Sequence, residues 1–359
     1  MQLFKKVTNH PFFIKLFNWE YWPFNLVYGP IYLYWLWLCI RARAIFFFNT
    51  SNPSIKNGGF LLESKKEIYD LIPPQYYPCT ILLDKDVQAS ELRKQVKESN
   101  FIFSLIAKPD IGMRGLAVQK VETIEELLSY AKQSRVRFLV QQFIPLENEV
   151  GIFYYRLPGE KNGHITGIVG KEFLTVTGDG SRTIETLLSL DKRFILQLKT
   201  LKESYGNQLQ RILLMGEKYL MVPYGNHSRG AKFLDITHLV DEKLILFIDG
   251  VCQQIPGFYY GRMDIRYNTW EELKQGKNFS IIELNGAGSE PTHIYDPNHS
   301  IFFAWKEIIR HWNILLKVSM LNHHSRQIPY MSILSGLNMF LENSVYVKLI
   351  QPPLPANEN

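Results

Sequence analysis

Two short segments late in the chain carry polar side chains at every second residue, and this repeat constrains the fold more than any other feature. They read GRMDIRY (261–267) and SIIELN (280–285). Because successive side chains of a β-strand point to opposite faces, every second residue shares a face. The polar linker 268–279 contains Gly276, so the two strands can return as an antiparallel pair. We therefore expect one sheet surface to carry Arg262, Asp264, Arg266, Glu283 and Asn285.

The oxygen-bearing members of this set are typical ligands of a small hard cation. Mg²⁺ takes oxygen ligands, keeps several waters and completes its shell with substrate phosphates. Asp264, Glu283 and Asn285 therefore form a candidate Mg²⁺ (or Mn²⁺) site, and Arg262 would stabilise charge on a transferring phosphoryl group. Each residue alone has a simpler interpretation, with Asp264 and Arg262 as a surface ion pair and Glu283 as an ordinary strand residue.

Two earlier segments are candidate nucleotide contacts. KPDIGMRG (108–115) follows an apolar strand, and a lysine before a glycine-containing loop can hold phosphates by charge and backbone amides. It lacks the GKS or GKT of a Walker loop. In LVQQFIPLENEVGIFYYR, Glu149 follows a strand and a turn, where a carboxylate can accept hydrogen bonds from ribose hydroxyls. A solvated glutamate is the plainer alternative.

Strands and helices alternate from residue 101 onward. We expect helices at 65–72, 123–133, 183–194, 196–215, 301–321 and 330–340. Thr123 is the expected N-cap of the second of these, with Glu125 and Glu126 in its first turn. Apolar residues make up 46% of the 359, which is enough for a packed core.

Charge and cysteine content exclude some functional classes. The net charge of +6 comes without a Lys/Arg run, so we expect no nucleic-acid partner. The three cysteines have no metal spacing, which indicates a reducing compartment. Cys252 is expected to be a small core residue.

An aromatic-rich segment, 24–48, leaves three alternatives open. Its unbroken apolar part, 31–40, is shorter than the roughly 20 residues that span a bilayer. Its Trp and Tyr residues and the flanking Arg41 and Arg43 also suit a helix lying in the membrane surface. Burial against the rest of the protein is the third alternative.

Taken together and in this order, the segments between 101 and 297 resemble the ATP-grasp superfamily, most closely its D-alanine–D-alanine ligase and cyanophycin-synthetase-like branches. The resemblance implies an α+β fold in which two α+β lobes grip ATP. The chain would add an atypical aromatic-rich N-terminal region and C-terminal helices. It implies a small lobe at 101–172 and a large lobe with the Mg²⁺ site at 173–300. Residues 1–100 would form the N-terminal region and 301–359 the C-terminal helices and tail.

By the same resemblance, ATP would be bound by residues of both lobes. Lys108 would contact the α- and β-phosphates, and Met113, Arg114 and Gly115 would close over the γ-phosphate. Glu149 would bind ribose. Lys171 and Arg229 would contact phosphate or substrate beside Arg262. The hinge against adenine would be Gln141, Gln142, Phe143 and Ile144.

The implied activity is an ADP-forming ligase that joins a carboxylate to an amine through an acyl phosphate. A small-molecule kinase on the same scaffold and a membrane-associated nucleotide-binding protein without turnover are the alternatives. The expected partners are the carboxylate and amine substrates. Contact with a membrane surface through 24–48 and formation of a homodimer are both left open. We expect a cytoplasmic protein, or one peripheral to the inner face of the membrane.

Overall fold

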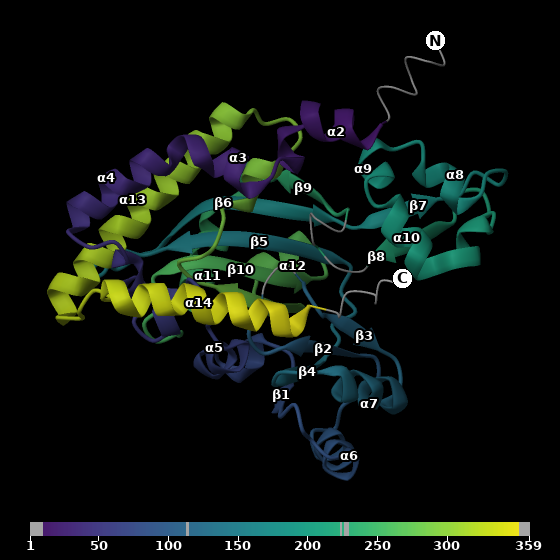
Figure 1. The fold of residues 1–359 in the computed structure, drawn as a ribbon, viewed down its shortest axis with the longest axis horizontal. Helices are drawn as coiled ribbons and strands as arrows, with labels where there is room; N and C mark the ends of the chain where they lie inside the picture. Colours follow the sequence, from purple (N-terminus) through teal and green to yellow (C-terminus); the bar gives the residue numbers. More distant parts are fainter. Residues whose placement is uncertain (1–9, 113–114, 223–224, 226–229, 352–359) are drawn as a thin grey trace, which may run out of the picture.

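The structure is a computed structural model that describes residues 10–112, 115–222, 225 and 230–351. Its strands form antiparallel sheets of four, five and two strands, with helices around them (Figure 1). This arrangement confirms the expected α+β class.

The four-stranded sheet and two helices form the lower part of the molecule in Figure 1. One sheet face packs on the helices through residues such as Leu105, Val140, Leu92 and Leu127. The opposite face carries Lys108. The elements are β1 (Thr80–Leu83), β4 (Phe138–Gln142), β2 (Leu105–Pro109) and β3 (Gln119–Val121), in sheet order, with α6 (Ala89–Glu98) and α7 (Ile124–Gln133).

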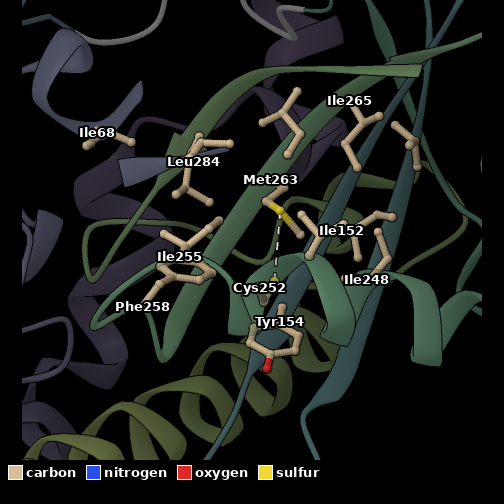
Figure 2. Packing of buried hydrophobic residues seen from close by; sticks show 14 of the residues in the cluster. Ile68, Ile152, Tyr154, Ile248, Cys252, Ile255, Phe258, Met263, Ile265 and Leu284 are labelled. Atoms are coloured by element: carbon tan, nitrogen blue, oxygen red, sulfur yellow. Dashed lines mark hydrogen bonds between the residues drawn. The ribbon is translucent and has the colours of Figure 1, made fainter. Parts of the chain in front are cut away.

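The five-stranded sheet occupies the centre, and its residues alternate between a core face and a charged face. Met263 and Ile265 point toward α11, where Met263 lies against the buried Cys252 (Figure 2). Cys252 is thus a core residue, as predicted. The strands are, in order, β11 (Phe279–Asn285), β10 (Tyr260–Tyr267), β5 (Asn148–Tyr155), β6 (His164–Glu172) and β9 (Lys232–Asp235); the helices are α11 (Glu242–Gln253) and α12 (Trp270–Lys274).

A third unit has its own small core at the right of Figure 1. Here the prediction of two long helices, 183–194 and 196–215, is wrong. Asp191 caps a new helix, and Gly206, at φ +49°, ends the last one. The elements are β7 (Leu174–Thr177), β8 (Lys218–Val222), α8 (Ile184–Leu188), α9 (Lys192–Ile195) and α10 (Leu198–Tyr205).

The two ends of the chain pack together. Buried Asn52 binds four backbone groups: it accepts from the N–H groups of Tyr259 and Tyr260 and donates to the carbonyls of Gly58 and Tyr260, at 2.8–3.0 Å. Asn322 donates to the carbonyls of Thr50 and Ser51. The helices are α2 (Pro11–Phe17), α3 (Phe24–Tyr28), α4 (Tyr32–Ala42), α5 (Lys65–Leu71), α13 (Ile301–Arg326) and α14 (Ile333–Ile350).

Both C-terminal helices extend beyond their predicted ends. The second begins at Ile333, after the N-cap Ser332, rather than at 330. None of the helices in the described residues combines the length and the apolar composition that spanning a bilayer requires. The aromatic segment is in part buried, since Leu38, Phe47 and Phe48 lie in a core with Leu315 of α13.

The sheets also differ from the expected lobe boundaries. β1 lies before residue 101 yet pairs with β4, while β5 and β6, placed by prediction in the small lobe, belong to the five-stranded sheet. The expected bounds came from the resemblance, whereas strand pairing, which the sequence pattern does not give, groups these strands differently.

Candidate active site

The charged face of the five-stranded sheet collects most of the predicted site. In the β10–β11 pair, Asp264 lies opposite Glu283 and Arg262 opposite Asn285. On the other side of β10, Arg266 lies opposite Glu149, which in turn lies opposite Lys171 of β6. Directly opposed residues of antiparallel strands share a face and have Cβ atoms roughly 5 Å apart. The predicted antiparallel pairing of the two late strands is confirmed.

A buried network of alternating charges joins three strands. The Nζ of Lys171 lies 2.8 Å from Glu149 Oε1 and 3.1 Å from Asp264 Oδ2. Arg262 Nε donates to Asp264 Oδ1 at 2.9 Å, and its Nη1 donates to the Glu290 carbonyl. Arg266 Nε lies 2.9 Å from Glu149 Oε2. The ion pair between Asp264 and Arg262 is thus real, but it is buried in a network and does not lie at the surface.

These contacts hold the charged forms of the network in place. Burial by itself raises the pKa of Asp264, but Arg262 and Lys171 outweigh it and lower that pKa. Burial likewise opposes the charge of Lys171, yet Asp264 and Glu149 raise its pKa. Gly151, opposite Asp264, leaves room for the side chains of Asp264 and Arg262: a Cβ there would lie 2.9 Å from Asp264 Oδ1 and 3.3 Å from Arg262 Cδ.

Lys108 reaches the same place from the four-stranded sheet. Its Nζ donates to Gln141 Oε1 at 2.9 Å and to Tyr69 Oη at 3.0 Å, and lies 3.5 Å from the Ile282 carbonyl of β11. Burial lowers the pKa of Lys108 to about 8, with the charge of Glu283 opposing the shift. The lysine therefore lies between the two sheets as a cation with few compensating charges.

Two of the candidate metal ligands have unused polar atoms. Within the described part of the chain, the Glu283 carboxylate has no hydrogen-bond or ion-pair partner, and the buried Asn285 Nδ2 also lacks one. Glu63 is similar, because its Oε2 is buried and has no hydrogen-bond partner among the described residues. Burial raises the pKa of Glu63, and the charge of Glu283 adds to this shift. Unpaired carboxylates and an amide at one place suit a cation. The described residues contain no group of three or more His, Cys, Asp or Glu that could hold a metal. The candidate set has two carboxylates, Asp264 and Glu283, and the amide of Asn285.

The predicted hinge residues, 141–144, contact different parts of the protein. Gln141 Nε2 donates to Thr80 Oγ1, while Gln142 exchanges hydrogen bonds with the backbone of Ile102. Lys120 lies over the Phe143 ring at 4.6 Å. Gln142 is therefore engaged with the 101–104 loop, and Ile144 is half-buried.

The predicted phosphate loop and Arg229 fall largely outside the described residues. Met113, Arg114 and Arg229 are not among them. Gly115 has φ +68°, a backbone conformation that favours glycine. Gly225 packs on the network, where a Cβ would lie 2.4 Å from Glu149 Oε1.

The structure adds residues that the sequence analysis missed. Tyr28 of α3 donates to Glu290 Oε1 at 2.7 Å, and Tyr295 donates to the same oxygen at 3.3 Å. Glu290 follows the Gly-rich turn after β11, and its carbonyl binds Arg262. Tyr28 is more than 200 residues distant in sequence, so no local spacing could have indicated it.

No protein-family model and no curated protein matches the sequence. Among solved structures, a bifunctional glutathione synthetase from Pasteurella multocida matches with a TM-score of 0.35 and 16% identity. That match covers 67% of this chain and 36% of the synthetase. A D-Ala:D-Ser ligase from Enterococcus faecalis matches with a TM-score of 0.39 and 12% identity, over 72% of this chain and 61% of the ligase.

A D-cycloserine synthetase matches with a TM-score of 0.40 and 9% identity, over 69% of this chain and 70% of that one. The chain thus spans about a third of the glutathione synthetase and about three fifths of the D-Ala:D-Ser ligase.

Proposed function

We propose that this protein is an ATP-grasp ligase that joins a carboxylate to an amine through an acyl phosphate, with release of ADP. The observation that carries the proposal is the shared face of β10, β11, β5 and β6. It brings Lys171, Arg262 and Arg266 together with Asp264 and Glu283, and Lys108 meets it from the other sheet.

The cations of this face suit a polyphosphate. Lys171 and Arg262 are now neutralised by Glu149 and Asp264, and Lys108 is held by neutral oxygens. Phosphate oxygens are strong acceptors for such groups, and positioned cations stabilise charge that develops during phosphoryl transfer. We assign Lys108 to the phosphates and Lys171 and Arg262 to the phosphoryl group that moves.

The residues present also fit a magnesium ion. Asp264, Glu283 and Asn285 would hold it. Among the described residues, neither the Glu283 carboxylate nor the Asn285 side-chain nitrogen has a partner, which supports this assignment. An amide side chain can present its oxygen in place of its nitrogen by a half-turn. When bound, magnesium would neutralise charge on the nucleotide's terminal phosphates.

In the proposed reaction the substrate carboxylate attacks the γ-phosphate, and an amine then displaces phosphate from the acyl phosphate. Positioning and charge stabilisation account for most of the rate in such transfers, so no nucleophilic side chain is needed. Arg262 is placed to stabilise both steps, because its guanidinium is fixed between Asp264 and the Glu290 carbonyl.

The test is an ADP-release screen over amino acids, hydroxy acids and short peptides, repeated with hydroxylamine. An acyl phosphate reacts with hydroxylamine to give a hydroxamate, so a ligase yields hydroxamate in the absence of the amine. ADP release with a stable phosphorylated alcohol and no hydroxamate would instead assign a kinase.

Glu283→Gln serves as the site variant because it removes a charge without breaking an ion pair. We expect at least a hundredfold loss of ADP release, on the scale of removing one charge-stabilising group. Glu203→Gln, on the exposed side of α10, is the matched control and is expected to keep wild-type activity. Equal activity of Glu283→Gln and wild type would refute the site assignment.

A further inference from the structure

The exposed large apolar side chains are concentrated on the helices at the two ends of the chain. Soluble monomers rarely expose contiguous apolar patches of more than a few hundred Å². Here α2, α3, α4 and α14, with the turn after α4, hold most of those found among the described residues. They are Phe12, Leu16, Phe17, Phe24, Leu26, Tyr32, Leu33, Leu36, Trp37, Ile40, Ile45, Ile333, Leu334, Leu337, Phe340, Leu341, Val345 and Leu349.

On α4 these side chains form a stripe. Leu33, Leu36, Trp37 and Ile40 are between 52% and 78% exposed. Their spacing of three and four residues places them on one side of a helix. The opposite side, which includes Leu38, is buried against the protein. The helix is therefore apolar on both its inner and its outer face.

α14 repeats this arrangement. Ile333, Leu337, Leu341, Val345 and Leu349 recur every four residues and are between 41% and 65% exposed. Its inner side carries the buried Met339. The apolar stripe of a helix ordinarily faces a core, yet within the described part of the chain nothing covers this outer stripe.

The two stripes meet at one end of the molecule. Phe46, just after α4, forms a β-bridge with Met331, and its ring packs where Gly336 of α14 lacks a side chain. Ile45 beside it is 48% exposed. In Figure 1, α14 begins at the end of the molecule where α13 ends, and the chain leaving α4 passes that corner.

Charge at this surface is mostly positive. Arg41 and Arg43 at the end of α4 and Lys348 of α14 are exposed and have no ion-pair partner among the described residues. Glu342 is the exposed acid of α14. Trp37 and Tyr32 among aliphatic residues, with cations at the edge, are typical of helices that lie in a membrane interface.

From these observations we infer that α4 and α14 form one docking surface for an anionic lipid bilayer, with both helices parallel to the membrane plane. Aliphatic side chains of the two stripes enter the headgroup–acyl boundary, and Arg41 and Lys348 contact lipid phosphates. Each such cation contributes roughly fivefold to binding of an anionic surface. The inference does not depend on the proposed ligase activity.

Vesicle flotation of the full chain tests this surface. Phosphatidylcholine vesicles with and without 30% phosphatidylserine are the probes. We expect wild type to float with the anionic vesicles at least tenfold better than with the neutral ones. Leu337→Asp/Leu341→Asp and Trp37→Asp/Ile40→Asp should each lose at least tenfold of that binding, while circular dichroism stays unchanged because the side chains are exposed.

Two further variants separate charge from apolar contact. Arg41→Gln/Lys348→Gln should reduce binding to the anionic vesicles alone, by roughly tenfold or more. Leu214→Asp/Leu246→Asp is the matched control: both leucines are more than 70% exposed but lie elsewhere, and binding should stay within twofold of wild type.

Three results would overturn the inference. Wild type could remain with neither vesicle, or the stripe variants could float as well as wild type. Light scattering could also show a dimer that Leu337→Asp/Leu341→Asp dissociates while flotation is absent. The last result would make the surface an interface between two copies of the chain.

Discussion

Replacing Lys108 by methionine removes a cation from the candidate phosphate site. Its effect on the free energy of unfolding should be more favourable near neutral pH than at alkaline pH. Lys108 is buried, and its pKa is about 8, against 10.5 for an exposed lysine. This difference of about 2.5 pKa units, at about 1.4 kcal/mol per unit, corresponds to about 3.4 kcal/mol. The free energy is the penalty for keeping the ammonium charged in the folded state.

The direction with pH follows from proton binding. Between pH 8 and 10.5 the unfolded chain binds the proton and the folded protein does not, so the wild-type free energy of unfolding rises with pH across this window. The stability gained by leaving Lys108 neutral in the folded protein is fully present above pH 10.5 and is lost as the pH falls through 8. Between pH 7 and 10 it changes by about 2.5 kcal/mol.

Methionine has no such dependence but leaves Gln141 Oε1 without its donor, at roughly 1–3 kcal/mol. We therefore expect Lys108→Met to be about as stable as wild type or more stable at pH 7, and less stable at pH 10. Urea unfolding at pH 7, 8, 9 and 10 measures the difference, with the exposed Lys132→Met as the matched control. A difference between Lys108→Met and wild type that stays constant with pH would refute the reasoning.

Three other changes probe the site and the scaffold. Asn52→Ala should lower the free energy of unfolding by about 3 kcal/mol or more in urea denaturation, because it leaves buried backbone groups of Tyr260 and its neighbours unpaired. Glu283→Gln should weaken the dependence of nucleotide affinity on Mg²⁺ in calorimetric titrations with and without EDTA. Burial opposes the charge of Glu307, but His293 and Arg310 lower its pKa to about 2, so it contributes stability that is fully present above pH 4.5 and lost toward pH 2. Glu307→Gln should flatten that acid limb of the stability curve, as measured by thermal unfolding.

Each of these has a contrary outcome. Asn52→Ala within 1 kcal/mol of wild type would show that the hydrogen bonds of Asn52 contribute little to stability. An unchanged Mg²⁺ dependence in Glu283→Gln would remove Glu283 from the metal site. An acid limb that keeps its wild-type slope in Glu307→Gln would show that other carboxylates account for it.

The sequence by itself determined the elements that follow from local spacing. The two-residue repeat in 261–267 and 280–285 predicted two antiparallel strands with Asp264 and Glu283 on one face, because side-chain direction in a strand is a local property. Thr123 likewise marked the start of α7, since its side chain caps the N–H of Glu126. Cys252 was predicted to be a core residue because a free cysteine behaves as a small apolar residue, and it is buried.

Tertiary structure alone decided what distant segments supply to the site. The positions of Tyr28 beside Glu290 and of Tyr69 beside Lys108 depend on how α3 and α5 dock, and docking is set by the whole apolar surface buried. The grouping of strands into sheets was also decided by tertiary structure, because β1 joins β4 through hydrogen bonds between residues about 60 positions apart. Local spacing fixes which way a side chain points, whereas the partner that it meets is selected by long-range packing.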